Sequence, residues 1–403
     1  MAESGSIGGR RRHDGAVIAL IAAAHFLSHF YQLVLPPLLP MMRAELGLSY
    51  AALGSSLAVL SAVTALGQTP IGVWADRTGA APWLVAGNAL MVVGTLGFAA
   101  ADGMAMLVVA AIVGGLGNAT IHPCDYAILS GSIRQDRMGR AFSLHTAAGY
   151  AGFAAGPPAM ILLEGWLGWR GALTAAAVAG VPCVLAIALF AKQLRSETKT
   201  RRERPPAHRL LASRPILLLF LFMTLIAIGG FGAQTFMVAA LPKLHDVSIA
   251  SAATAMTLWL VGSTLGTLAG GWIADRTKRH VAVVTAMMLS AGIMVAGLGV
   301  LSLGVGGMIA LAAGAGFALG VVMPSRDLIV RATAPPGTAG QVFGFVSSGL
   351  PLGQALAPPP LGLLMDLGLP WALFVACGVV LTAAVLTVHG ARAAHRAVLA
   401  PAE

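Results

Sequence analysis

The chain has 403 residues, of which 57% are apolar and only 10% are charged, and its mean hydropathy is +0.83. This composition excludes a soluble globular domain, because so few polar side chains could not cover a chain of this length. A formal net charge of +10 would suit a nucleic-acid-binding protein, but here the basic residues lie between long apolar stretches. We therefore predict a protein that crosses a membrane many times, and no nucleic-acid partner.

Twelve apolar stretches are long enough to cross about 30 Å of hydrocarbon as helices. They cover residues 16–40, 50–73, 83–101, 104–131, 141–163, 171–191, 215–240, 251–273, 281–302, 306–331, 341–364 and 371–389. Six precede and six follow a basic segment that has few apolar side chains to bury. The prediction is an all-α polytopic membrane protein with an N-terminal six-helix bundle over 1–191, a cytoplasmic linker over 192–214 and a C-terminal six-helix bundle over 215–403.

Lysine and arginine residues indicate the orientation, because basic residues beside a span are retained in the cytoplasm. Most of them fall in loops on one side, and only Arg43, Arg170 and Lys243 fall in loops on the other. Both termini are therefore predicted to lie in the cytoplasm, and the chain in the cytoplasmic (inner) membrane. The first stretch is too long for the apolar part of a signal peptide, so we expect it to remain as a span.

Several functional classes lack their sequence signals. The chain shows no glycine-rich nucleotide loop between a strand and a helix, no Ser-His-Asp order and no long extramembrane segment, so an enzyme is not predicted. Cys124, Cys183 and Cys377 are odd in number and lie in apolar stretches, which favours small buried side chains over disulfides. We expect neither a resident metal nor another cofactor.

One short pattern occurs twice, once in each half of the chain. Gly72-Val-Trp-Ala-Asp76-Arg77-Thr78 ends the second stretch, and Gly271-Trp-Ile-Ala-Asp275-Arg276-Thr277 ends the eighth. The repeat extends to Gln32 in the first stretch and Gln234 in the seventh. Because each half has an even number of predicted spans, the two halves are predicted to be parallel repeats, related by an axis along the membrane normal.

The duplicated pattern resembles the loop signature of the major facilitator superfamily, and the resemblance covers essentially the whole chain. Within that superfamily, the glycine-rich run that precedes Ile121-His122-Pro123 resembles the fosmidomycin-resistance efflux family. The resemblance implies two six-helix bundles that work by alternating access, with helices 1, 4, 7 and 10 lining a central cavity. It also implies gating loops, which contain Gly72, Asp76, Arg77, Gly79, Gly271, Asp275 and Arg276.

Few ionisable side chains occur within the apolar stretches, where each is costly unless it faces protein or water. His25 and His29 lie four residues apart, and therefore on one face of the first predicted helix. Intramembrane polar groups of this kind are functional candidates by default. The predicted substrate and proton pathway contains His25, His29, Gln32, His122, Asp125, His145, Gln234, Arg326 and Asp327.

Asp125 and Arg326 occupy equivalent positions in the two halves, each two residues after a proline. Three interpretations of these charges remain open. Asp125 could exchange a proton as access alternates, Asp125 and Arg326 could form a salt bridge that closes the cytoplasmic gate, or each could be satisfied locally, Arg326 by Asp327.

The histidines also leave alternatives open. Each could be a neutral imidazole hydrogen-bonded between helices, or several together with Arg326 could form a positive pocket for a small anion. The spacing of His25 and His29, with Cys124 beside Asp125, leaves a transition-metal path as a third interpretation.

These patterns together favour a secondary transporter that acts as a monomer in the lipid bilayer. Its predicted function is proton-coupled efflux of a small anionic compound, with protons as the coupling ion. Proton-coupled uptake of an organic acid is the first alternative, and transition-metal export is the second.

Overall fold

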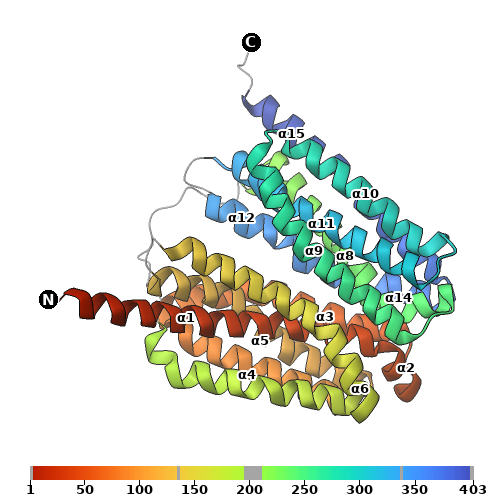
Figure 1. The fold of residues 1–403 in the computed structure, drawn as a ribbon, viewed down its shortest axis with the longest axis horizontal. Helices are drawn as coiled ribbons and strands as arrows, with labels where there is room; N and C mark the ends of the chain where they lie inside the picture. The colour runs from red at the N-terminus through yellow and green to blue at the C-terminus, as the bar shows by residue number, and fades with distance from the viewer. Residues whose placement is uncertain (1–2, 134–136, 195–210, 336–338, 400–403) are drawn as a thin grey trace. The chain divides into compact units, whose positions relative to one another are not determined.

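The computed structural model describes residues 3–133, 137–194, 211–335 and 339–399, and every element that it assigns there is helical (Figure 1). The first half contains α1 (Glu3–Gln32), η1 (Pro36–Leu38), α2 (Leu39–Leu46), α3 (Tyr50–Thr78), α4 (Ala80–Ala99), α5 (Met104–Ser132), α6 (Met138–Phe190) and η3 (Ala191–Gln193). The second contains α8 (Arg214–His245), α9 (Ile249–Arg276), α10 (His280–Val300), α11 (Val305–Thr333), α12 (Ala339–Ser347), α13 (Gly349–Leu356), α14 (Pro358–Asp366) and α15 (Pro370–Leu399).

Ten helices in the described residues are long and apolar enough to cross a membrane. They account for eleven of the twelve predicted spans, because α6 contains two of them, 141–163 and 171–191. Gly168, at φ 68° and ψ 170°, interrupts the helical backbone of α6 between the two. A side chain would strain this backbone conformation, which glycine adopts freely. The two predicted spans thus correspond to the two helical segments on either side of Gly168.

The remaining predicted span, 341–364, is not one continuous helix. It is divided among α12, α13 and α14, with breaks near Ser348 and Ala357. Pro358, Pro359 and Pro360 follow the second break, and prolines suit the first turn of a new helix better than a helix interior. The hydropathy of this segment predicted its burial in the membrane but not its division.

The chain forms two compact units, the first made of residues 1–48 and 59–202 and the second of residues 49–58 and 203–403. The start of α3 belongs to the second unit, where the Asp366 carboxylate accepts hydrogen bonds from the backbone N–H groups of Tyr50 and Ala51, both at 2.8 Å. A carboxylate stabilises a helix N-terminus in this way. Much of the predicted linker, residues 195–210, lies outside the described residues, so the predicted domain limits stay predictions.

Glycines allow the closest helix contacts in both units. In the first, α4 packs on α5, and α1 packs on α6. In the second, α9 packs on α11, where Gly262, Gly266 and Gly270 lie against the backbone of α11 and leave no room for a Cβ. Small residues four apart let membrane helices approach closely where lipid supplies no hydrophobic drive for association.

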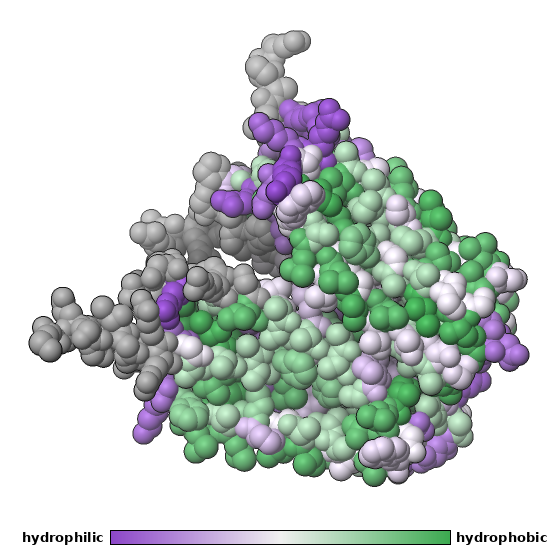
Figure 2. Space-filling view, viewed as in Figure 1, coloured by the Kyte–Doolittle hydropathy of each residue, from purple (hydrophilic) through white to green (hydrophobic). Residues whose placement is uncertain are grey.

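Large apolar side chains also face outward. Leu66, Leu189 and Leu386 each keep more than 70% of their surface exposed, and apolar residues cover most of the face seen in Figure 2, with hydrophilic residues near the helix ends. A surface of this kind is stable against lipid rather than water. The protein is therefore an all-α polytopic membrane protein.

Candidate functional site

Three helices of the first unit bring ionisable side chains together. His25 and His29 come from α1, His122 and Asp125 from α5, and His145 from α6. We call these five residues the histidine cluster. The cluster assembles only through tertiary packing, because His145 is 20 residues from Asp125 and on another helix.

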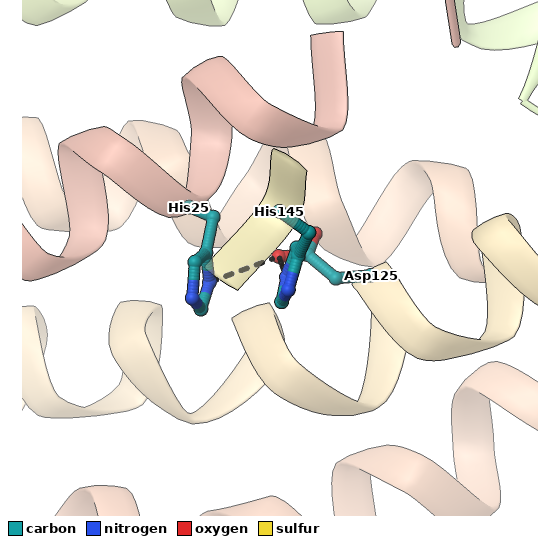
Figure 3. Close-up of side chains that lie close together, drawn as sticks. All are labelled: His25, Asp125 and His145. Atoms are coloured by element: carbon teal, nitrogen blue, oxygen red, sulfur yellow. Dashed lines mark hydrogen bonds and ion pairs between the residues drawn. The ribbon is translucent and has the colours of Figure 1, made fainter. Parts of the chain in front are cut away.

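Asp125 is the centre of the histidine cluster (Figure 3). Its Oδ2 atom lies 3.0 Å from Nε2 of His145, a hydrogen-bonding distance, and 3.4 Å from Nδ1 of His25, an ion-pair distance. The rings of His25 and His145 stack with their centroids 3.7 Å apart. One carboxylate oxygen therefore faces two imidazole nitrogens at once.

His29 and His122 surround this contact at a greater distance. The ring centroid of His25 lies 4.4 Å from that of His29 and 5.1 Å from that of His122. His29 and His122 meet edge to face at 5.9 Å, and Tyr126 stacks on His122 at 6.3 Å. Tyr126 is 48% exposed, so the cluster reaches the surface of the first unit through this ring.

Local sequence explains how each helix presents these groups. His25 and His29 are one helical turn apart, as are His122 and Tyr126. Gly149 of α6 provides the space, because a Cβ there would lie 2.7 Å from the His25 ring and 3.2 Å from the His29 ring. Sequence reasoning had singled out the histidines but missed Tyr126 and Gly149. The spacing from His122 could have indicated Tyr126, whereas no local pattern indicates Gly149.

Asp125 is fully buried, so its carboxylate is costly to ionise without a partner. Asp125 is 0% exposed, and its Oδ1 atom has no hydrogen-bond partner. An ionised carboxylate is costly in such a place unless it is paired with a cation, and the groups close to it are imidazoles. The carboxylate is thus stabilised either by taking up a proton itself or by a proton on His25 or His145.

The same three residues have donor atoms that suit a transition metal. One ligand atom from each of His25, Asp125 and His145 lies within 4.8 Å of the others. Two imidazoles and a carboxylate are a common donor set for such ions. This geometry is what a transition-metal path would need.

Comparison with known families decides the class of protein. The family model of the Major Facilitator Superfamily matches residues 21–280 and 220–401. The chain belongs to this superfamily. It is therefore a multi-pass membrane transporter of a small molecule, and the resemblance seen in the duplicated loop is confirmed.

Individual relatives within the superfamily agree. The chain is 25% identical to a chloramphenicol resistance protein of Streptomyces lividans over 85% of this chain and 88% of the relative. It is 21% identical to a fosmidomycin resistance protein of Escherichia coli (strain K12) over 67% of this chain and 68% of the relative. The crystal structure of a mutant of the nucleoside transporter NupG has the same fold, with a TM-score of 0.79, 14% identity and coverage of 92% of this chain and 99% of that one.

The superfamily loop occurs at the end of α3 and again at the end of α9. Arg77, Asp275 and Arg276 are exposed there, and Arg276 lies over the Trp272 ring with its guanidinium carbon 4.0 Å from the ring centroid. Gly79 adopts φ 92°, and Gly271 has open space beside it. The side chain of Asp76 lies outside the described residues. Gly72 is close to α5, since a Cβ there would lie 3.5 Å from Pro123.

Arg326 and Asp327 of α11 form a local ion pair in the second unit. Nε and Nη2 of Arg326 each lie 2.9 Å from Oδ1 of Asp327. Nη1 of Arg326 and the hydroxyl of the neighbouring Ser325 are buried without a hydrogen-bond partner. Arg326 is thus paired with its neighbour Asp327, and a gate pair between Asp125 and Arg326 stays a prediction.

The two predicted glutamines lie in different surroundings. Gln32 of α1 borders a cavity of about 20 Å³ in the first unit, together with Ser28 and Asn118. Gln234 lies on α8 of the second unit, where it is partly buried.

Proposed function

We propose that this protein is a proton-coupled secondary transporter that exports a small anionic compound from the cytoplasm by alternating access. It would act as a monomer in the cytoplasmic membrane, with both termini in the cytoplasm. The observation that carries the proposal is the wholly buried Asp125 carboxylate in contact with two imidazoles. Such a group can hold a proton in one state of the transporter and release it when water reaches it in the other.

Histidines supply most of the titratable surroundings of Asp125. The groups that face it are His25 and His29 from α1, His122 and Tyr126 from α5, and His145 and Cys183 from α6. The helix α4, which packs on α5, carries no Asp, Glu, His, Lys or Arg. None of the residues that face Asp125 here is a lysine or arginine. A proton bound to Asp125 can therefore be shared with the neighbouring imidazoles, because no permanent positive charge among these residues stabilises the ionised carboxylate in its place.

Export and an anionic substrate rest on separate arguments. The similarity to the chloramphenicol resistance protein covers 85% of this chain and that to the fosmidomycin resistance protein 67%, and resistance to a drug is commonly achieved by removing it from the cell. The anionic charge is proposed because imidazoles outnumber carboxylates in the histidine cluster and can gain positive charge near neutral pH.

A growth-inhibition panel tests this function first. Cells with and without the protein would be compared on chloramphenicol, fosmidomycin, other phosphonates, organic acids, lipophilic cations and transition metals. Protection against an anionic compound, abolished by a protonophore, is the expected result. Protection confined to metals or lipophilic cations would contradict the anionic substrate, and protection that survives the protonophore would contradict proton coupling.

Arg326 gives a second prediction about the substrate. If its guanidinium binds the anion, Arg326→Lys should weaken binding about tenfold to hundredfold, because lysine keeps the charge but loses the planar fork. Arg326→Ala should abolish binding. The measurement is equilibrium binding of the anion from the growth panel to purified protein.

Asp327→Asn is the matched control for this prediction. It would release Nε and Nη2 of Arg326 from their present partner, so anion binding should stay at the wild-type level or become tighter. If Asp327→Asn and Arg326→Ala instead weaken binding equally, the two residues form a structural ion pair and Arg326 is not the anchor.

A further inference from the structure

His29 and His122 differ from the other members of the histidine cluster in what their nitrogens contact. Both ring nitrogens of His29, Nδ1 of His122 and Nδ1 of His25 are buried without a hydrogen-bond partner, although Nδ1 of His25 lies 3.4 Å from Oδ2 of Asp125. His145, by contrast, is bonded to Asp125, and His25 faces the same carboxylate oxygen. Buried polar atoms in native proteins are normally satisfied, and an exception calls for a partner such as a water, an ion or a ligand.

We propose that His29 and His122 form the binding site for an oxyanion group of the transported compound, a carboxylate or a phosphonate. This inference rests on the proposed function and divides the cluster into two parts. His25, Asp125 and His145 hold the proton, whereas His29 and His122 contact the compound.

The chemistry of imidazole selects this class of ligand. A neutral imidazole has one N–H donor, and a protonated one has two. Two neighbouring imidazoles can therefore direct N–H groups at two oxygens of one carboxylate or phosphonate, and any protonation of either ring strengthens these bonds. A lipophilic cation offers no acceptor to such donors, and extra protons in the cluster would repel it.

A small cavity lies elsewhere along α1 and α5 in the first unit, and neither His29 nor His122 lines it. The 20 Å³ cavity is bordered by Ser28 and Gln32, which flank His29 on α1, and by Asn118, one turn before His122 on α5. A cavity of this size holds about one water molecule. The compound would therefore need α1 and α5 to separate, as a helix movement during alternating access would allow. Ser28, which lines this cavity, has an unpartnered hydroxyl and can then donate a further hydrogen bond.

The same arrangement would couple binding of the proton to binding of the transported anion. The His25 ring, which faces the Asp125 carboxylate, lies 4.4 Å from the His29 ring and 5.1 Å from the His122 ring. At such separations in a buried site, a proton gained by the first part of the cluster attracts an anion at the second. Release of the proton would then weaken the hold on the anion.

Nuclear magnetic resonance of purified protein with ¹⁵N-labelled histidine tests this directly. The probes are methylphosphonate and acetate, with tetraphenylphosphonium and Zn²⁺ as contrasting ligands. The ring signals of His29 and His122, assigned by His29→Phe and His122→Phe, should shift saturably with the oxyanions. Each variant keeps a ring of similar shape and should weaken methylphosphonate binding at least tenfold.

His389→Gln is the control, because His389 is exposed on α15 of the second unit and bonded to Thr285. It should bind methylphosphonate as the wild type does. Oxyanion binding that leaves the His29 and His122 signals unmoved, no oxyanion binding at all, or shifts produced only by Zn²⁺ or tetraphenylphosphonium would each overturn the inference. The wild-type spectra are informative even if a phenylalanine variant fails to fold.

The NMR test of the oxyanion site can fail or succeed independently of proton coupling. Asp125→Asn should still show the oxyanion-dependent shifts of His29 and His122, although it lacks a titratable carboxyl group. If those shifts occur while transport proves independent of a pH gradient, the oxyanion site stands and the proton-coupled function fails. If transport is proton-driven but the shifts are absent, the proton-coupled function stands and the oxyanion site at His29 and His122 fails.

Discussion

Asp125→Asn is expected to abolish transport driven by a pH gradient while leaving exchange of the compound across the membrane intact. Asparagine has nearly the shape of aspartate and can still bond to His145, but it cannot gain or lose a proton. The measurement is uptake and exchange of the labelled compound in proteoliposomes, with and without an imposed gradient. We expect driven transport to fall to the level of protein-free liposomes.

Asp246→Asn is the matched control for this change. Asp246 is exposed after α8 and has a left-handed backbone at φ 51°, which asparagine also adopts readily. Driven transport by this variant should equal that of the wild type. Undiminished driven transport by Asp125→Asn would exclude Asp125 as the proton carrier. If Asp125→Arg combined with Arg326→Asp then recovered activity lost in either single variant, the two residues would instead form a gate.

Gly152→Ala is expected to destabilise the first unit and to abolish transport. A Cβ at Gly152 of α6 would overlap the carbonyl oxygen of Phe26 on α1 and would lie 3.0 Å from the backbone nitrogen of Phe30. Backbone atoms cannot move aside as a side chain can, so α1 would have to shift. Overpacking of this kind costs about 1–3 kcal/mol or more. Because α1 carries His25 and His29, the histidine cluster would be disturbed as well.

Gly165→Ala is the control within the same helix, since a Cβ at Gly165 meets nothing within 4 Å. Thermal unfolding of purified protein and driven transport would be measured for both variants. Gly165→Ala should match the wild type or be slightly more stable, because alanine favours the helix. Wild-type stability and transport in Gly152→Ala would show that the close approach of α1 and α6 is not needed.

The fold was largely predictable from sequence because hydrophobic length decides which segments cross a membrane. Eleven of the predicted spans correspond to helices long enough to cross it. The exceptions depend on backbone detail. Hydropathy predicts the two spans on either side of Gly168 but not that a single non-helical residue joins them, and it does not show that 341–364 is divided before Pro358.

The members of the histidine cluster were predictable, whereas their contacts were not. Ionisable residues in apolar stretches are few, so His25, His29, His122, Asp125 and His145 could each be named. That Asp125 faces His25 and His145, rather than His122 one turn away on its own helix, depends on how α1, α5 and α6 pack. The contact between Arg326 and Asp327 could be predicted as one possible arrangement, because neighbours in sequence can reach each other. The sequence could not exclude the alternative pairing of Arg326 with Asp125.

Protonation of Asp125 itself is the most direct test of the account. Infrared difference spectra of the purified protein in lipid would be recorded as the pH is lowered, and those of the wild type would be compared with those of Asp125→Asn. We expect a carbonyl band of a protonated carboxylic acid, or a band change of the linked imidazoles, that appears in the wild type and is missing in the variant. Identical pH-dependent spectra for the two proteins would contradict it.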